Sequence, residues 1–315
     1  MKKILVTGSS GFVGQRLVES LLEQGSEVIG FSRKKYNSSC PVYIGELDDI
    51  DSIRGALNGV DVVIHAAARS HVMNDESLDP LAEYRRVNVE GTRNVVTAAI
   101  EAGVKRCIYI SSIKANGEQT EPGEALGHSS KLMPGDAYGI SKVEAEMVLN
   151  KLAKGSALET VIIRPPLIYG PKVKGNFTSL VRLVKSRLPL PFGLIHNQRS
   201  FVFLGNLIDL IMNCVDNPRA VNQTFLVSDG EDLSTSELLI QLKQSSNGKA
   251  YLIPIPSLLL KTLLLVLGKR DLSQKLLGNL QIDISHTCET LHWKPPYTVE
   301  QGLNKCHFHS ELDRD

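Results

Sequence analysis

Short apolar runs rich in β-branched residues alternate with amphipathic stretches through the first half of the chain. Such runs predict buried strands, and apolar residues spaced three and four apart predict helices. Strands that alternate with helices of this length indicate βαβ units. We therefore expect an α/β fold, a doubly wound parallel sheet of the Rossmann type. The expected strands are Lys3–Thr7, Glu27–Phe31, Val42–Ile44, Val62–His65, Cys107–Ser111 and Thr160–Arg164, and the expected helices are Val13–Glu23, Ile50–Leu57, Leu81–Ala102 and Ser141–Ala153.

The regular alternation ends after Pro171, where glycines and prolines become frequent. We predict a dinucleotide-binding Rossmann domain over 1–172 and a smaller C-terminal α/β substrate domain over 173–315. A segment near 200–228 is expected to return to the first domain. The densest apolar run, Leu258–Leu267, is about half the length of a membrane span. It predicts a buried helix, with a helix lying at a membrane interface as the alternative.

Composition narrows the function classes. The 315 residues are 42% hydrophobic and 22% charged, which is typical of a globular protein. A net charge of +1 gives no indication of binding to nucleic acid or to an anionic membrane. The five cysteines are scattered, which predicts neither disulfides nor a zinc site and fits a reducing compartment. Without a signal-peptide pattern or a membrane-spanning run, we expect a cytoplasmic enzyme; the triplet His307–His309 alone does not make a metal site.

A glycine-rich loop follows the first expected strand directly and leads into a helix. Its sequence is TGSSGFVG, residues 7–14. Glycines let the backbone turn sharply and approach a pyrophosphate, and the helix N-terminus supplies free N–H groups and a positive dipole end. We predict a dinucleotide here, against Gly8, Ser10, Gly11, Phe12, Val13 and Gly14.

The end of the second strand selects between the two nicotinamide cofactors. An acidic residue there would hold the ribose hydroxyls of NAD, whereas an arginine accommodates the 2′-phosphate of NADP. This chain has Ser32 and Arg33, which favours NADP, with NAD as the alternative. Glu46 and Leu47 follow the third strand, where the adenine would lie. Ala66, Ala67 and Ala68 follow the fourth and leave room for the ribose and phosphates.

Three residues further along form a candidate catalytic set. Tyr138 and Lys142 are four apart and therefore share one helix face. A nearby ammonium favours a phenolate and lowers the pKa of the tyrosine toward the working range. Ser112 follows the fifth strand, at the carboxyl edge of the sheet where ligands of such folds bind. Its hydroxyl can hydrogen-bond a substrate oxygen while Tyr138 exchanges the proton.

Six motifs in order resemble the signatures of extended short-chain dehydrogenase/reductases, the NAD-dependent epimerase/dehydratase family. They are TGSSGFVG, HAAA, VNVEGT, the ISS before Ile113, YGISK and RPPLIYGP, and LHWKPPYTVEQGL resembles the family's C-terminal segment. The resemblance implies catalytic roles for Ser112, Tyr138 and Lys142. It places Pro165 and Ile168 near the nicotinamide, Arg199 on a nucleotide-sugar diphosphate, and Asn176 near the sugar. It also implies a homodimer formed through the helices at Leu81–Ala102 and Ser141–Ala153.

Details within the family order the candidate functions. Dehydratases that resemble this chain carry an Asp-Glu pair after the serine, but here Ile113 and Lys114 follow Ser112, which disfavours dehydration. HAAARSHVM, SSIKANGE and KGNFTSLVRLV resemble a bacterial branch that reduces a 4-keto sugar nucleotide. Asn116 departs from the tyrosine of many relatives.

The leading hypothesis is a 4-ketoreductase of a UDP-4-keto-6-deoxy-N-acetylhexosamine in surface polysaccharide synthesis. The alternative is a UDP-hexose 4-epimerase acting on UDP-glucose or UDP-N-acetylglucosamine with the same three residues. A reductase of a lipophilic ketone and a non-catalytic dinucleotide sensor are further alternatives. Each of the enzyme hypotheses requires the same dinucleotide site.

Overall fold

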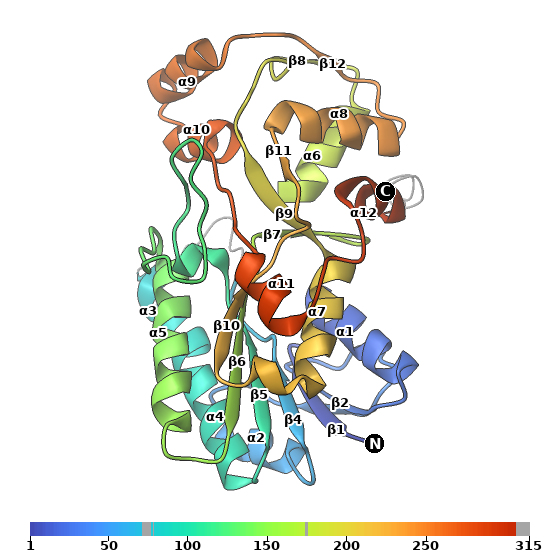
Figure 1. Cartoon of the computed structure of the whole chain (residues 1–315), viewed down its shortest axis with the longest axis vertical. Helices are drawn as coiled ribbons and strands as arrows, with labels where there is room; N and C mark the ends of the chain where they lie inside the picture. The colour runs from blue at the N-terminus through green and yellow to red at the C-terminus, as the bar shows by residue number, and fades with distance from the viewer. Residues whose placement is uncertain (71–76, 78, 174–175, 307–315) are drawn as a thin grey trace.

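The computed structural model describes residues 1–70, 77, 79–173 and 176–306. A parallel sheet in the order β10-β6-β5-β4-β1-β2-β3 forms its centre (Figure 1). Helices cover both faces, which confirms the expected Rossmann-type fold. The strands of this sheet are β1 (Lys3–Thr7), β2 (Glu27–Ser32), β3 (Val42–Ile44), β4 (Val62–His65), β5 (Arg106–Ile110), β6 (Glu159–Arg164) and β10 (Gln223–Leu226).

Alternate strand residues point into two separate core layers. Ile4 and Val6 of β1 pack on the face covered by α1 (Phe12–Glu23) and α7 (Leu204–Asp216). Leu5 packs on the other face, beneath α2 (Ile50–Ala56), α4 (Gly91–Glu101) and α5 (Ala137–Ala153). This burial on both sides explains why the strands are almost continuously apolar.

The helix expected over Leu81–Ala102 is interrupted. α3 (Pro80–Tyr84) leads into a π-helical turn, η1 (Arg85–Glu90), before α4 begins. Asn88 within that turn donates from Nδ2 to Ser141 Oγ at 2.9 Å and accepts from the backbone N–H of Arg69 at 2.8 Å. Wider turns of this kind are frequent at functional sites, and this one brings a polar side chain to the N-terminal part of α5.

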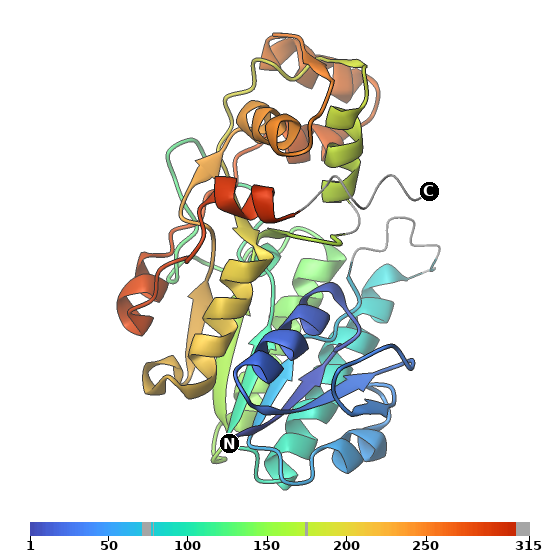
Figure 2. The ribbon, with the colours of Figure 1, turned by 90° about the vertical axis from the view of Figure 1, so that its right-hand side faces the viewer.

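The C-terminal half builds a smaller body on top of the sheet (Figures 1 and 2). Its strands are β7 (Leu167–Tyr169), β9 (Arg199–Phe203) and β11 (Asp232–Leu233) in one small sheet, and β8 (Pro189–Leu190) paired with β12 (Tyr251–Leu252). Its helices are α6 (Asn176–Lys185), α8 (Thr235–Ser245), α9 (Ser257–Val266), α10 (Arg270–Leu277) and α12 (Val299–Lys305). In the large domain, α11 (Ser285–Leu291) packs beside β10, and the short 3-10 turns η2 (Ile113–Ala115) and η3 (Pro218–Ala220) follow β5 and α7.

The domain boundary at residue 172 stays a prediction. β7 precedes that residue and belongs to the smaller sheet, whereas α7 and β10 follow it and pack in the large domain. β10 pairs with β6, with Gln223 opposite Val161. The chain therefore crosses between the two bodies several times.

The sequence predicts a buried helix over Leu258–Leu267, and the burial is wrong. α9 forms there, but among its ten residues, all of them described, Leu260 alone is buried. The apolar run is long enough for a helix but lies at the outer end of the smaller body (Figure 2). Within the described residues, no helix combines the length and apolar character required to cross a bilayer.

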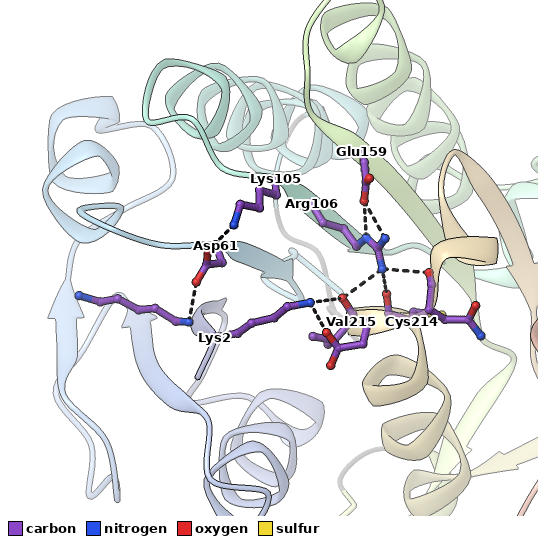
Figure 3. A network of polar contacts seen from close by, with 10 residues as sticks. Lys2, Asp61, Lys105, Arg106, Glu159, Cys214 and Val215 are labelled. Carbon is purple, nitrogen blue, oxygen red and sulfur yellow. Dashed lines mark hydrogen bonds and ion pairs between the residues drawn. The ribbon is translucent and has the colours of Figure 1, made fainter.

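A polar network ties the N-terminal edge of the sheet to α7 (Figure 3). Arg106 of β5 pairs with Glu159 of β6 and donates from Nη1 to three carbonyls after and within the last turn of α7. These carbonyls lack helical partners, so the guanidinium satisfies them and complements the helix dipole. Nearby, Asp61 accepts from Lys105 and from the backbone of Lys3.

Candidate active site

The glycine loop is shaped by steric demands at two positions. Gly8 has φ +69°, a left-handed conformation, and a Cβ there would lie 2.7 Å from Ala67 Cα. A Cβ at Gly14 would lie 2.1 Å from the carbonyl oxygen of Gly8. A side chain at position 8 would push the loop away from the residues after β4. A side chain at position 14 would push α1 away from the loop. The glycines therefore keep backbone at the place where the dinucleotide is predicted.

The N-terminus of α1 fits an anionic group. Gly11 is its N-cap, no described side chain caps the helix, and its first turn contains no acidic residue. The first N–H groups of a helix have no internal partner, so they can donate to phosphate oxygens. Phe12 and Val13 are partly buried against the core beneath α7, and this packing holds the helix start in place.

The end of β2 lies beside this loop. Ser32 Oγ donates to Ser10 Oγ at 2.8 Å and to the carbonyl of Lys34 at 3.0 Å. Ser32 is therefore buried in the loop contact, whereas the neighbouring Arg33 is exposed. A guanidinium in this position can reach a ribose phosphate, as the sequence predicts for NADP. An arginine without a role in cofactor binding would be exposed in the same way.

The other predicted cofactor residues line the same carboxyl edge. Glu46 is exposed and Leu47 is half-buried, with the Leu47 carbonyl accepting from Asn94 at 2.8 Å. The three alanines after β4 are half-buried, and the N–H of Ala67 donates to Thr7 Oγ1 at 3.3 Å. The structure thus places the residues predicted from β1, β2, β3 and β4 at one edge of the sheet.

His65 supports this edge from below, a role that sequence reasoning missed. Its ring nitrogens contact Thr7 Oγ1 at 2.7 Å and Thr92 Oγ1 at 3.1 Å. Burial, and secondarily the charge of Lys142, lowers the pKa of His65 to about 3, so the ring is neutral at neutral pH. Its place at the end of an apolar strand was the sequence signal that could have identified it.

Ser112 and Tyr138 meet at the carboxyl end of β5. Ser112 is the N-cap of η2 and accepts from the N–H of Lys114 at 3.3 Å. Asp136 caps α5 through the N–H of Gly139 at 2.7 Å and thereby fixes the first turn, which carries Tyr138. Burial raises the pKa of Tyr138 above its usual value, and a side-chain hydrogen bond with Ser112 opposes that shift.

Lys142 lies one turn below Tyr138 and is 1% exposed. Its Nζ donates to Tyr109 Oη at 2.9 Å and to the carbonyl of Ile110 at 2.7 Å, and lies 5.9 Å from the Tyr138 ring centroid. Burial lowers the pKa of Lys142 to about 7. The expected lowering of the Tyr138 pKa by this amine is therefore absent here, because burial dominates the phenol and Tyr109 engages the amine.

A buried ion pair underlies Lys142. Arg164 at the end of β6 binds both oxygens of Glu146, which lies one helical turn after Lys142. Ser111 also donates to Glu146, and the carboxylate charge opposes the lowering of the Lys142 pKa. Arg164 further donates to Asn116 Oδ1 at 3.0 Å. The asparagine that departs from the family pattern is thus bonded to this cluster, which the sequence analysis did not identify.

The remaining predicted residues are spread over two places. The carbonyl of Pro165 accepts from Ile113 at 2.9 Å, beside Ser112, and Ile168 is half-buried against the main core. Arg199 begins β9 and donates to the carbonyl of Gly278 at 3.0 Å, and burial lowers its pKa. Asn176 begins α6, but its side chain is not among those described. The described residues contain no cluster of three metal-ligating side chains, and the 307–309 triplet lies outside them.

Comparison with known proteins identifies the family. Residues 4–228 match the model of the NAD dependent epimerase/dehydratase family. A UDP-glucose 4-epimerase of Vibrio cholerae is 46% identical over 96% of this chain and 94% of its own length. An N-acetyl-α-D-glucosaminyl-diphospho-ditrans,octacis-undecaprenol 4-epimerase of Escherichia coli O157:H7 is 30% identical over 96% of this chain and 93% of its own.

A solved structure shares the fold throughout. It is a UDP-glucuronic acid 4-epimerase of Bacillus cereus in complex with NAD, 20% identical, with a TM-score of 0.74 and 96% of each chain covered. The two curated relatives favour the epimerase alternative over the 4-ketoreductase placed first by the sequence. The chain is an enzyme of the NAD-dependent epimerase/dehydratase family, the extended short-chain dehydrogenase/reductases, and its cofactor is a nicotinamide dinucleotide.

Proposed function

We propose that this enzyme is a UDP-sugar 4-epimerase that uses NAD. The observation that carries the proposal is the 46% identity to a UDP-glucose 4-epimerase, which extends over nearly the whole of both chains. The arrangement of Ser112, Tyr138 and Lys142 at the carboxyl edge of the sheet supports it, because reversible oxidation of a sugar hydroxyl needs a group that removes and returns a proton.

Tyr138 is the proposed acid–base. A nicotinamide dinucleotide held at the glycine loop would supply reversible hydride transfer at the sugar C4. As a phenolate, Tyr138 takes the proton of the C4 hydroxyl and gives it back when the C4 hydroxyl is restored, while Ser112 holds the same sugar oxygen. Lys142, with a pKa near 7, exchanges its hydrogen bond to Tyr109 for contacts that favour the Tyr138 phenolate. The sugar must rotate within the site between the two hydride transfers.

The binding residues predicted from the sequence complete the proposal. The α1 N-terminus and the backbone of Gly8 and Gly11 bind the pyrophosphate of NAD, and Ser32 contacts the adenosine ribose. Exposed Arg33 then lies at the rim and does not select the cofactor. Arg199 and Asn176 are the proposed diphosphate and sugar contacts. A homodimer through α3, η1, α4 and α5 stays a prediction from family resemblance.

The test separates an epimerase from a ketoreductase with one purified protein. Incubation with UDP-glucose or UDP-N-acetylglucosamine and NAD should interconvert the C4 epimers, without net change in dinucleotide absorbance. A parallel reaction contains NADPH and UDP-4-keto-6-deoxy-N-acetylglucosamine. Stoichiometric loss of NADPH there, with no epimerisation of either hexose, would restore the ketoreductase hypothesis.

A second candidate substrate is a sugar joined through a diphosphate to a polyprenol. The relative of Escherichia coli O157:H7 bears the name of such an epimerase and aligns over almost the whole chain. Both candidates share the diphosphate-linked hexose and differ in the group beyond the diphosphate. Competition by free UDP distinguishes them, because UDP should block a nucleotide-sugar site strongly and a polyprenyl-diphosphate site weakly.

A further inference from the structure

The outer end of the smaller body exposes an unusual concentration of apolar side chains. α9 has the sequence SLLLKTLLLV, so leucines lie on every side of the helix. A helix that is apolar all round is normally buried in a core. Here the exposed fractions reach 72% at Leu258, 54% at Leu263 and 80% at Val266. Other exposed apolar residues of the same end are Leu259, Leu265, Leu267, Leu272, Tyr251 and Ile253.

α9 is held as a hairpin with α10 at the end of the molecule farthest from β1, as both views show (Figures 1 and 2). Gly268 turns the chain with φ +70°, and the N–H of Lys269 donates to the carbonyl of Leu264 at 2.8 Å. Leu260 is buried and Leu264 half-buried on the side toward the body. The hairpin is therefore a fixed structural element that presents its other leucines outward.

Two segments of the same end carry an excess of cations over acids. Segment 176–192 has three cations and no acid, and segment 238–280 has six cations and a single acid, Asp271. Their combined formal charge is +8 in a chain of net charge +1, so the rest of the sequence carries −7. The exposed cations of these segments are Arg182, Arg187, Lys249, Lys261, Lys269, Arg270 and Lys275.

The combination of exposed leucines and cations indicates which kind of partner fits this surface. A second copy of the chain would bring two strongly positive ends together, which repel each other. The cores of protein interfaces are depleted in lysine. Anionic phospholipid headgroups attract clustered Lys and Arg, and the acyl boundary takes leucines from a helix that lies in the interface plane. At 1.5 Å per residue, α9 is about 15 Å long, half of a hydrocarbon core, and cannot span it.

We propose that the α9–α10 hairpin docks the enzyme on an anionic phospholipid surface. The exposed leucines of α9 enter the boundary between headgroups and acyl chains, and the cations of α10 and of segment 238–280 contact lipid phosphates. The proposal goes beyond the epimerase activity and holds for either sugar carrier. The near-neutral net charge, which the sequence analysis took as evidence against membrane contact, hides a polarised distribution.

The experiment is co-sedimentation of the full-length protein with vesicles, in the absence of sugar and cofactor. We expect at least tenfold tighter binding to vesicles of phosphatidylcholine with 30% phosphatidylglycerol than to phosphatidylcholine alone, weakened by salt. The triple variant Leu258→Ser, Leu263→Ser and Val266→Ser should lose at least tenfold in binding and keep the wild-type circular dichroism spectrum, because all three side chains are exposed.

Matched variants on α5 serve as controls. Met147→Ser removes another exposed apolar side chain, and the pair Lys151→Glu and Lys154→Glu reverses two exposed cations distant from α9. Both should bind vesicles like the wild type, whereas Lys269→Glu with Arg270→Glu should bind at least tenfold more weakly. Equal sedimentation of wild type and triple variant would overturn the proposal. So would a wild-type dimer, seen by analytical ultracentrifugation, that the triple substitution dissociates while vesicle binding is absent.

Discussion

At the scale of single residues, chemistry at this site depends on burial more than on residue type. From the sequence, the ammonium of Lys142 is expected to lower the pKa of Tyr138. In the structure, burial raises the Tyr138 pKa and lowers that of Lys142 to about 7, because each charged form loses its contact with water. Ser112 is the group that opposes this effect at the phenol.

Replacing Tyr138 by Phe removes the proposed acid–base and leaves the packing nearly unchanged. We expect turnover of the sugar nucleotide to fall by at least about 100-fold, the usual contribution of a positioned proton-transfer group. The affinity for dinucleotide, followed by fluorescence titration, should stay within twofold. Tyr84→Phe is the matched control, since its ring lies 5.9 Å from that of Tyr138 and should tolerate the same change. Undiminished turnover of the Tyr138 variant would exclude the assignment.

Lys142 should also shape the pH dependence of stability. Its pKa is about 7 in the folded chain and 10.5 when exposed, so the unfolded state binds more protons between these values. The free energy of unfolding therefore rises with pH above 7, by at most about 1.4 kcal/mol per unit. Lys142→Met should remove this rise between pH 7 and 8.5, as measured by urea unfolding.

The pH window ends at 8.5 because buried thiols act in the opposite direction beyond it. Burial raises the pKa of Cys107 and Cys214 to about 12, so stability falls with pH once thiols ionise in the unfolded chain. Lys151→Met, at an exposed position of the same helix, should keep the wild-type slope. Identical slopes for wild type and Lys142→Met would contradict a lowered pKa at this lysine.

At the scale of elements, η1 shows how a wide turn links three parts of the site. The π-helical geometry places Asn88 against the loop after β4 and against Ser141, whose hydroxyl also donates to the Tyr138 carbonyl at 2.7 Å. Three hydrogen bonds of one buried amide thereby join the loop after β4, η1 and α5. A straight helix over the same residues would turn this side chain to a different direction.

Asn88→Ala should destabilise the fold by about 1–3 kcal/mol, because it leaves the Ser141 hydroxyl and the Arg69 backbone short of partners in a buried region. The shift of the urea midpoint measures this cost. Arg93→Ala, which breaks an exposed pair with Glu90, should cost below about 0.5 kcal/mol. If the two variants unfold at the same urea concentration, the Asn88 bonds do not stabilise the site.

At the scale of the whole molecule, Arg106 joins segments more than 100 residues apart (Figure 3). It connects β5 to the end of α7, the helix that follows β9 and returns the chain to the large domain. Its guanidinium is buried, whereas Lys105 beside it is exposed and pairs with Asp61 at the surface. Arg106 is therefore expected to contribute more to the free energy of unfolding than Lys105, although both carry one positive charge.

Arg106→Ala should lower the free energy of unfolding by about 2–4 kcal/mol, since it leaves three carbonyls and the Glu159 carboxylate without this partner. Lys105→Ala removes an exposed ion pair and should cost below about 1 kcal/mol. Equilibrium denaturation of both variants, followed by far-UV circular dichroism, gives the comparison. A cost for Arg106→Ala no larger than for Lys105→Ala would show that the network does not hold α7 to the sheet.

The sequence by itself determined the parallel sheet and the glycine loop. A strand that is buried on both faces needs a nearly continuous run of apolar residues. The close contacts at Gly8 and Gly14 leave little room for any side chain. The spacing of Tyr138 and Lys142 also follows from helix geometry alone. These features are local, so a reader of the sequence can recover them from neighbouring residues.

Only the tertiary structure decided the rest. The bond from Lys142 to Tyr109, the interrupted helix at η1 and the exposure of α9 depend on contacts between residues distant in the sequence. An apolar helix has the same sequence pattern whether it is buried or exposed, because the pattern carries no information about the neighbouring elements. Likewise, a net charge of +1 sums over the chain, whereas folding places the two cation-rich segments, 176–192 and 238–280, in the same body.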